Sequence, residues 1–397
     1  MPPHITVGQF NESYKPIMDG VGLCAENYAR WIHEKHGTAY AVVPRVPGYE
    51  DDDPYTVIRY PSLPVPRMAP YRFGVPWASP TLGRRLRSIP FDIVHSHSPF
   101  VAGRMARRTA GSRGIPHVST FHTKYRDDFT RFTTVAPAVH AFVNGLVRFY
   151  NSCDHVWTPS DATKRTLREY GYEGEITVVP NGSDLRRPSA EERARYRAEG
   201  ESLCGVPHDA FVFLFVGQHR WEKNVELILR SIALLVGEEL RGPVALVFAG
   251  EGYAAQDMKR MACELGIGDR TVFLGKIVER ERLKAVYARA DLFLFPSVYD
   301  NAPLVMREAA AFGVPTVVAE GSSAAEAIRE DENGFAVPVD AEAMAARLKR
   351  LVENRDLVSR VGTNASLSVY RSWEDIVDWV AGEYERIIVR HRRSVSQ

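Results

Sequence analysis

The residues best suited to chemistry lie in the second half of the chain, in segments that follow short apolar runs. The run Phe211–Val216 leads into Gly-Gln-His-Arg-Trp-Glu-Lys-Asn (Gly217–Asn224). Its glycine permits a sharp exit from a strand, and Lys223 supplies an ammonium group ahead of a predicted helix N-terminus, which together suit a phosphate. Because a strand followed by glycine and lysine is common, an ordinary turn is the alternative. The segment Ala249–Tyr253 repeats this pattern with two glycines, and the same alternative applies.

Two carboxylates stand close together in the segment Phe295–Pro315. A helix is predicted to begin near Pro303, with Asp300 just before it and Glu308 about a turn and a half inside it. Both carboxylates can then face one ligand. Carboxylates accept hydrogen bonds from hydroxyl groups, which sugars and ribose offer. The alternative is that Asp300 only caps the helix.

The first half of the chain carries two histidine-containing segments, each at the end of a predicted strand. They are Val94–Phe100, with His95 and His97, and Ser119–Tyr125, with His122. Imidazole nitrogens suit zinc. These histidines come from separate strands, and no acid or thiol stands at ligand spacing beside them in the sequence, so we expect no metal site.

Short apolar runs alternate with helical patterns along most of the chain, and the rhythm restarts once. Strands separated by helices predict parallel sheets covered on both faces, so two such series predict two doubly wound, Rossmann-like α/β domains. Such sheets bind ligands beyond the carboxyl ends of their strands, and we expect the two domains to face a cleft. The expected strands are His4–Val7, Ala39–Val43, Asp92–His95, His117–Phe121, His155–Thr158, Ile176–Val179, Phe211–Val216, Val244–Ala249, Thr271–Leu274, Leu292–Phe295 and Thr316–Ala319.

The polar stretch Leu185–Glu201 separates the two series and predicts a domain boundary near residue 185. We expect one domain over residues 1–185 and the other over residues 186–374. The last segment, Ser372–Arg393, has apolar residues at helical spacing and predicts a long amphipathic helix. We expect residues 375–397 to return to the N-terminal domain.

Composition is typical of a globular protein. Of the 397 residues, 45% are hydrophobic and 25% charged, and no apolar run approaches the ~20 residues that span a bilayer. The N-terminus lacks the pattern of a signal peptide, so a cytoplasmic location is expected. The four cysteines lie far apart and form no C-x-x-C pair, which argues against a disulfide framework or a thiolate zinc site.

Charge is unevenly distributed, although the net charge is only +1. The stretch Pro61–Tyr150 contains thirteen lysine or arginine residues against three acids, a net charge of +10. One explanation is a solvated face balanced by acids elsewhere in the fold. The other is an anionic partner, either lipid head groups or phosphorylated substrates.

Taken together, these segments resemble the retaining GT-B glycosyltransferases of family four, in the glycogen-synthase-like superfamily. Phe295–Pro315 resembles their acidic-x7-acidic motif, and Val216–Asn224 resembles their strand–Arg–x4–Lys loop. Val179–Asp184 is similar to their interdomain Pro-Asn-Gly-x-Asp signature. Val272–Gly275 and Ala311–Ala319 also fit, so the resemblance covers nearly the whole chain in sequence order.

The resemblance implies a role for each matching residue. Lys223 holds the donor diphosphate, Glu308 binds the nucleotide ribose, and Asp300 contacts hydroxyl groups of the donor sugar. His122 contacts that sugar from the N-terminal, acceptor-binding domain, and Met18–Gly22 resembles a glycine-containing loop near the donor phosphates, with a plain helix start as the alternative. Transfer retains the anomeric configuration and needs no metal or other cofactor, the nucleotide sugar being a substrate. Further implied donor-binding residues are Gly20, Gly22, Gly217, Arg220, Gly250, Gly252, Asn301, Ala302, Leu304 and Val305, and His97 and Tyr125 are implied on the acceptor side.

Three positions depart from the family pattern. Gln218 stands where arginine is usual, Asp300 where glutamate is usual, and Pro303 where a glycine amide normally helps. The loss of one positive charge and one N–H weakens the expected grip on the diphosphate. Arg220, two positions after Gln218, can supply a substitute charge.

The acceptor is expected to be a membrane lipid. The segments around His97 and His122 resemble those of diacylglycerol glucosyltransferases. In addition, the basic stretch next to the apolar run Phe129–Tyr150 predicts a basic rim beside a hydrophobic cleft. The expected partners are thus a nucleotide-sugar donor, expected to be a UDP-sugar, a lipid or sugar acceptor and an anionic membrane surface, but no nucleic acid. A soluble acceptor, a sugar-nucleotide epimerase and a degenerate nucleotide-binding module are the alternatives.

Overall fold

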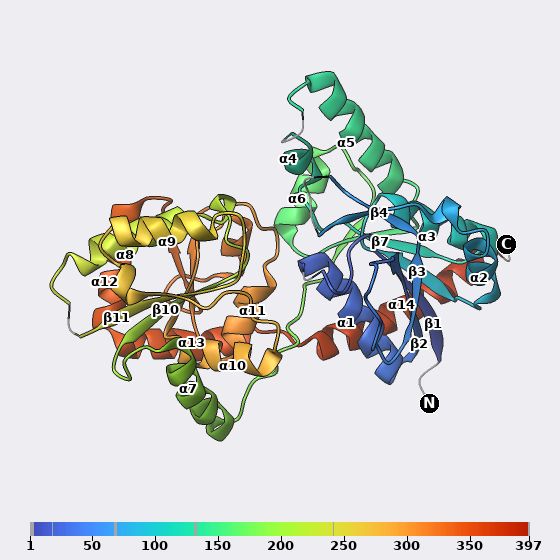
Figure 1. Ribbon diagram of the computed structural model, residues 1–397. Coiled ribbons are helices and arrows are strands. Elements are labelled where there is room, and N and C mark those ends of the chain that lie inside the picture. The colour runs from blue at the N-terminus through green and yellow to red at the C-terminus, as the bar shows by residue number, and fades with distance from the viewer. Residues whose placement is uncertain (1–3, 18, 67–69, 131–132, 241, 396–397) are drawn as a thin grey trace. The chain divides into compact units, whose positions relative to one another are not determined.

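The computed structural model describes residues 4–17, 19–66, 70–130, 133–240 and 242–395, which form two compact units (Figure 1). The first unit takes the chain up to Gly182 and again from Trp373, and the second takes Ser183–Ser372. Each unit contains a parallel sheet with helices on its faces. The predicted fold class, two doubly wound Rossmann-like domains, is therefore confirmed.

The first unit is built on a seven-stranded sheet in the order β3-β2-β1-β6-β7-β8-β9, with every neighbouring pair parallel. The strand order reverses between β1 and β6, and this switch point is where such sheets bind ligands. The strands are β1 Ile5–Phe10, β2 Gly37–Pro44, β3 Thr56–Tyr60, β6 Ile93–Ser96, β7 His117–Thr120, β8 His155–Thr158 and β9 Ile176–Val178. A separate antiparallel hairpin joins β4 Ser62–Pro64 to β5 Arg72–Gly74. The helices are α1 Gly20–Lys35, η1 Pro76–Ala78, α2 Leu82–Ser88, α3 Val101–Arg113, α4 Tyr125–Thr130, α5 Ala136–Tyr150, α6 Asp161–Glu169 and α14 Trp373–Val395.

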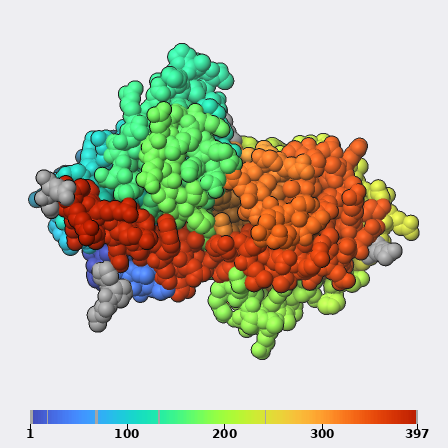
Figure 2. Space-filling model, turned by 180° about the vertical axis from the view of Figure 1, so that it is seen from behind, coloured from blue at the N-terminus to red at the C-terminus, as the bar shows by residue number. Residues whose placement is uncertain are grey.

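Helix α14, the amphipathic C-terminal helix, belongs to the first unit, as expected. Its apolar face is buried, and the ring of Tyr384 stacks on Trp157 of β8 with centroids 5.6 Å apart. Lys35 at the end of α1 forms ion pairs with Glu374 and Asp378 of α14. Figure 2 shows the deep red end of the chain lying on the surface next to the blue N-terminal segments.

The second unit is built on a six-stranded parallel sheet in the order β12-β11-β10-β13-β14-β15, and its strand order reverses between β10 and β13. The strands are β10 Phe211–Val216, β11 Val244–Ala249, β12 Thr271–Phe273, β13 Leu292–Phe295, β14 Thr316–Ala319 and β15 Phe335–Val337. The helices are α7 Ala190–Cys204, η2 Trp221–Lys223, α8 Val225–Val236, α9 Ala255–Glu264, η3 Gly268–Arg270, α10 Arg280–Arg289, α11 Leu304–Ala311, η4 Ser323–Ala327, α12 Ala341–Glu353 and α13 Arg355–Ser368.

Aromatic packing fixes the two central strands of this sheet. Phe215 of β10 and Phe295 of β13 are buried, and their rings stack with centroids 6.3 Å apart. Phe293 stacks on Phe295 in turn, at 6.0 Å. Each fully buried phenylalanine contributes about 2–3 kcal/mol. The strand ends from which the loops after β10 and β13 emerge are therefore held in place by buried aromatic side chains.

No helix among the described residues is long and apolar enough to cross a membrane. The C-terminal part of the apolar run Phe129–Tyr150 packs into the core of the first unit, whereas Val135 near the start of α5 is 59% exposed. Phe129 of α4 stacks on Phe142 of α5 with centroids 4.1 Å apart, and Leu146 and Tyr150 are buried. The C-terminal half of α5 thus belongs to the core, and the hydrophobic cleft expected beside the basic stretch stays a prediction.

Candidate active site

The loops after β10 and β13 bring Lys223 and Asp300 together at the switch point of the second unit. The ammonium group of Lys223 donates a hydrogen bond to Oδ1 of Asp300, and the two form an ion pair with both side chains mostly buried. The Lys223 Nζ also lies 5.8 Å from the ring centroids of Phe295 and Tyr299. An ammonium group lined by a carboxylate and aromatic rings is held in one place but stays partly accessible.

Hydrogen bonds to neighbouring residues support this pair. The hydroxyl of Ser297 donates to Oδ2 of Asp300 at 2.6 Å, which fixes the carboxylate. Asn224, next to Lys223, has a left-handed backbone with φ of 54° and donates its side-chain amide to the carbonyl of Pro296 at 2.8 Å. Asparagine tolerates this conformation better than most residues. The two loops are thereby tied to each other.

The first turn of α11 lies just after Asp300. Helix α11 starts at Leu304. Its N-cap residue is Pro303, which has extended backbone angles and makes no side-chain capping hydrogen bond within the described part of the chain. The first backbone N–H groups of a helix point outward with the positive end of the dipole, so the amides at Leu304 and Val305 are suited to an anion. Asn301 and Ala302 belong to the loop that leads into this turn.

Arg220 lies beside Gln218, the residue that replaces the family arginine. Its guanidinium is 3.4 Å from the Gln218 side-chain oxygen and 3.4 Å from a Glu222 oxygen, and it lies over the ring of Tyr253. The positive charge that Gln218 lacks is therefore present next to it, although Glu222 partly neutralises it.

Three glycines let the loops after β10 and β11 pack against each other. Gly217 and Gly250 have φ of 152° and 141°, and a Cβ on Gly250 would lie 1.9 Å from the Gly217 carbonyl oxygen. A Cβ on Gly252 would lie 2.2 Å from the carbonyl oxygen of His219. These glycines are required by backbone packing.

Glu308 is held by a second set of residues. The hydroxyl of Tyr287 donates to its Oε2 at 2.7 Å, and Arg280 approaches its Oε1 at 3.5 Å. The same guanidinium pairs with Asp184 at 2.5 Å. Burial raises the pKa of Glu308, and the charge of Arg280 acts in the opposite direction. Sequence reasoning missed Arg280 and Tyr287, whereas Asp184 lies in the Pro-Asn-Gly-x-Asp segment that it singled out.

In the first unit the glycine-containing loop forms the start of α1. Gly20 is the first residue of that helix, and Asp19 caps it by accepting the N–H of Gly22 at 2.7 Å. Ser13 in turn donates its hydroxyl to Asp19 at 2.5 Å. The N–H of Gly22 therefore already has an acceptor here. Met18, the first residue of the predicted loop, lies outside the described residues.

The histidines form a buried hydrogen-bonded network at the switch point of the first unit. Nδ1 of His97 lies 3.1 Å from Nε2 of His122, and Nε2 of His97 lies 2.9 Å from Oε1 of Gln9. His95 lies between the hydroxyls of Tyr384 and Thr120, at 2.5 and 2.7 Å. Burial lowers the pKa of His122 to about 3 and that of His97 well below its usual value, so both rings are neutral.

Tyr125, the other residue expected on the acceptor side, belongs to an aromatic cluster. Its ring lies 5.3 Å from Phe100 and 5.6 Å from Phe121, measured between centroids. Burial raises the pKa of its phenol. The structure gives it a packing role, and any contact with an acceptor comes in addition.

Two family descriptions match the chain. "Glycosyltransferase Family 4" matches residues 18–187, and "Glycosyl transferases group 1" matches residues 204–367. Together they take in most of both units.

Individual proteins agree with these matches. The chain is 29% identical over 323 residues to the alpha-monoglucosyldiacylglycerol synthase of Streptococcus pneumoniae. The aligned segment covers 80% of this chain and 71% of that protein. It is 28% identical over 371 residues to the D-inositol 3-phosphate glycosyltransferase of Streptomyces griseus, covering 86% and 76%. The structure of Anabaena Alr3699/HepE in complex with UDP and glucose shares its fold, with a TM-score of 0.72, 18% identity and coverage of 96% of this chain and 100% of that chain.

The two Rossmann-like units, the loops at their switch points and the match of each unit to a glycosyltransferase family lead to one conclusion. This chain belongs to the group 1 and family 4 glycosyltransferases, and it is an enzyme that transfers glycosyl groups.

Proposed function

We propose that this glycosyltransferase moves a hexose from a UDP-sugar to a hydroxyl group of a membrane lipid such as diacylglycerol, with retention of the anomeric configuration and without an obligatory metal. The observation on which the donor assignment rests is the Lys223–Asp300 ion pair, which lies next in the chain to the first turn of α11. The N-cap residue of that helix is Pro303. The name of the streptococcal relative supports a lipid acceptor, and the ligands of the Anabaena structure support UDP.

In this proposal the donor rearranges the ion pair. The diphosphate replaces Asp300 as the partner of Lys223, and its second charge meets the N–H groups at Leu304 and Val305. Asp300 is then available to accept hydrogen bonds from hydroxyls of the sugar. Negative charge grows on the leaving diphosphate during transfer, so groups fixed in advance stabilise the transition state more than the ground state.

Glu308 is assigned to the ribose of the donor. Tyr287 and Arg280 fix its carboxylate, and a fixed acceptor loses little entropy when it binds a hydroxyl. His122 is proposed to contact the donor sugar, on the basis of the family resemblance. The leaving phosphate itself is proposed to take the proton of the acceptor hydroxyl.

An exposed apolar surface on the first unit supports a membrane acceptor. We define this hairpin surface as Leu63, Phe73 and Trp77, which are 57%, 51% and 71% exposed. Leu63 and Phe73 are opposite each other in the β4–β5 hairpin, and the rings of Phe73 and Trp77 lie 6.4 Å apart. Aromatic residues with polar surroundings are typical of the membrane–water interface.

A basic surface adjoins this hairpin along the chain. Helix α2 begins a few residues after Trp77, buries Leu82 and Leu86, and exposes three arginines on its other side. Arg113 at the end of α3 donates to the carbonyl of Arg87, which joins α3 to α2. The exposed arginines of the two helices are Arg84, Arg85, Arg87, Arg104, Arg107 and Arg108. Each basic residue near an anionic bilayer contributes about 1 kcal/mol, so this surface favours such a bilayer.

Transfer is tested with UDP-hexoses and diacylglycerol in anionic vesicles, with the lipid product followed by mass spectrometry. Wild type should form a hexosyl lipid, and Lys223→Ala should lower kcat/KM by about 10²–10³-fold because the diphosphate loses its cation. The control is Arg350→Ala, which removes an exposed cation from α12. Equal rates in wild type and Lys223→Ala would refute the donor assignment.

Vesicle flotation at moderate salt tests the acceptor side separately. The double variant Phe73→Ser/Trp77→Ser and the double variant Arg84→Glu/Arg85→Glu should both lose binding to anionic vesicles. Matched controls are Leu367→Ser, 64% exposed on α13, and Arg350→Glu/Arg360→Glu. If wild type binds no vesicles and instead glycosylates a soluble acceptor, the lipid part of the proposal fails while the donor part stands.

A further inference from the structure

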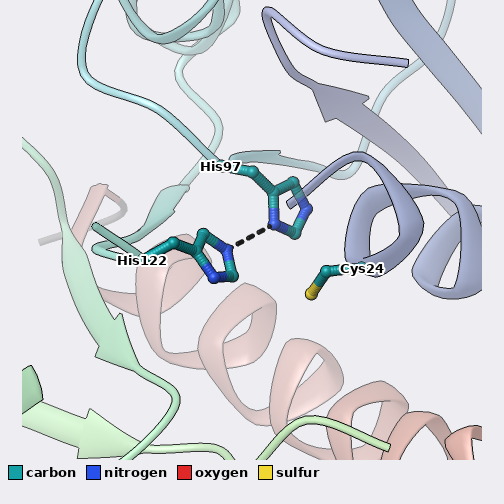
Figure 3. A group of neighbouring side chains, drawn as sticks. All are labelled: Cys24, His97 and His122. Carbon is teal, nitrogen blue, oxygen red and sulfur yellow. Dashed lines mark hydrogen bonds between the residues drawn. The ribbon is translucent and has the colours of Figure 1, made fainter. Parts of the chain in front are cut away.

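Cys24, His97 and His122 meet in the interior of the first unit (Figure 3). Cys24 comes from α1, His97 from the segment after β6 and His122 from the segment after β7. Their ligand atoms all lie within 4.8 Å of one another, and all three side chains are buried. Among the described residues, this is the one group of three or more histidine, cysteine or acidic side chains with such spacing.

Hydrogen bonds orient His97 as a metal-binding histidine. The side-chain amide of Gln9 donates to Tyr384 at 3.3 Å, so its oxygen accepts the Nε2–H of His97 at 2.9 Å. The Nδ1 of His97 then carries a lone pair that faces His122. A ring N–H donated to a carbonyl group, with the other nitrogen left for the ion, is the arrangement found around most metal-binding histidines.

The spacing agrees with a small tetrahedral ion. In a zinc site with Zn–N bonds of about 2.0–2.1 Å, neighbouring nitrogens are about 3.3 Å apart, and sulfur and nitrogen are about 3.6 Å apart. The two imidazole nitrogens here are 3.1 Å apart. The ligand atoms lie within 4.8 Å of one another, so the Cys24 sulfur must approach the histidine nitrogens by up to about 1.2 Å to reach tetrahedral spacing.

We propose that Cys24, His97 and His122 form a binding site for a thiophilic divalent cation, with Zn²⁺ as the probe. The cation takes the sulfur of Cys24, Nδ1 of His97 and Nε2 of His122. The proton of the thiol leaves to solvent, and the proton that His122 shares with His97 moves to Nδ1 of His122. Binding therefore releases one proton for each ion bound.

Three protein ligands leave a fourth position open. One thiolate neutralises only half of the charge of the cation, and a buried net charge is costly, so an anion from the buffer such as chloride is the expected fourth ligand. The bound cation would occupy His122, to which the proposed function gives a contact with the donor sugar. The site itself does not depend on that function, because it is defined by binding in the absence of donor and acceptor.

The experiment is a titration of the chelator-treated protein with Zn²⁺ and Co²⁺. It is done in a Cys263→Ser background, because Cys263 is the exposed cysteine and a source of adventitious binding. We expect one ion per chain, a sulfur-to-cobalt charge-transfer band, and release of about one proton measured by calorimetry in buffers of different ionisation enthalpy. Cys24→Ser and His97→Gln should each weaken Zn²⁺ binding by about 100-fold or more, and Cys24→Ser should lose the band.

A second cysteine serves as the matched control. Cys153 is also in the first unit and half-buried, but it lies outside the cluster, so Cys153→Ser should bind one ion as tightly as the parent. Thermal unfolding of each variant without metal shows that it is folded. Equal Zn²⁺ affinity in the parent and in folded Cys24→Ser, or no binding by the folded parent, would overturn the proposal. Glycosyl transfer is not measured, so either outcome leaves the proposed function untouched.

Discussion

The ammonium group of Lys223 lies against the carboxylate of Asp300, although the two residues are 77 positions apart in the chain. Each neutralises the other, so the ligand-free site does not present a bare cation to solvent. A diphosphate must compete with a carboxylate that is already in place. In the proposed donor site, the pair would link affinity for the nucleotide to the freedom of Asp300 to bind the sugar.

Replacement of Asp300 by Asn should separate binding from transfer. Without the carboxylate, Lys223 is unpaired, and UDP should bind up to about fivefold more tightly, which corresponds to about 1 kcal/mol for a partly exposed ion pair. Transfer should fall by about tenfold or more, because an amide accepts hydrogen bonds from sugar hydroxyls less strongly than a carboxylate. Calorimetry with UDP and initial rates measure the two effects.

Ser297→Ala serves as the comparison, since it removes the hydroxyl that donates to Asp300 and accepts the backbone N–H groups of Tyr299 and Asp300, but leaves the carboxylate in place. It should lower transfer modestly and leave UDP affinity near that of wild type. Weaker binding of UDP to Asp300→Asn than to wild type would show that Asp300 does not restrain Lys223.

The sequence predicted the fold because its strands are strongly marked. The run Phe211–Val216 is continuously aromatic and β-branched apart from one leucine, and β10 has the same bounds. Two of the four edge strands were predicted, β9 and β12, and two were missed: β3, which has a mixed pattern, and β15, Phe335–Val337. In β3 the charged Arg59 interrupts the apolar residues, which weakens the pattern that marks a strand.

The site was predicted only in part, because its contacts depend on strand order. Lys223 and Asp300 were both singled out, but their pairing follows from the position of β10 next to β13. Arg280 opens α10 without any local pattern that marks it as a partner of Glu308. Cys24 is 73 positions from His97, so its thiol was not recognised as a neighbour of the histidines.

Arg280 should stabilise the second unit through Glu308. Arg280→Met leaves the buried carboxylate without its cation and should lower the free energy of unfolding by about 3 kcal/mol. In a Glu308→Gln background the same change should cost much less, because the neutral amide needs no cation. Urea unfolding of the four proteins gives the coupling energy.

Asp184 provides a check on this cycle, because it also contacts Arg280. Asp184→Asn in the Arg280→Met protein separates the contribution of Asp184 from that of Glu308. A coupling energy near zero between Arg280 and Glu308 would contradict the assignment.

Gly252 should be intolerant of any side chain. In Gly252→Ala the new Cβ would lie 2.2 Å from the carbonyl oxygen of His219, so the loops after β10 and β11 must separate. We expect a loss of about 1–3 kcal/mol in the free energy of unfolding, together with weaker UDP binding. Gly145→Ala is the control: it lies in α5, where a Cβ would meet no heavy atom of the described residues within 4 Å, and should be stabilising by about 0.5–1 kcal/mol. Comparable stability of Gly252→Ala and wild type would exclude this packing argument.

Glu12 should make the stability of the protein depend on pH. Its carboxylate accepts the N–H of Ala102 in the first turn of α3 at 2.5 Å, while Oε2 is buried without a partner among the described residues. Burial raises its pKa from 4.5 to about 7. Between these two values the folded protein binds the proton more tightly than the unfolded chain, so this contribution to stability is lost as the pH rises.

Glu12→Gln removes this dependence and keeps an oxygen that can accept the N–H of Ala102. The free energy of unfolding of the variant should match that of wild type near pH 5. It should exceed that of wild type by up to about 3 kcal/mol at pH 8, because the shift in pKa is worth about 1.4 kcal/mol per unit. Urea unfolding from pH 5 to pH 8 measures the difference, with exposed Glu353→Gln as control. A difference between Glu12→Gln and wild type that is constant over this range would mean that Glu12 is ionised throughout, with its Oε2 charge stabilised in the folded protein.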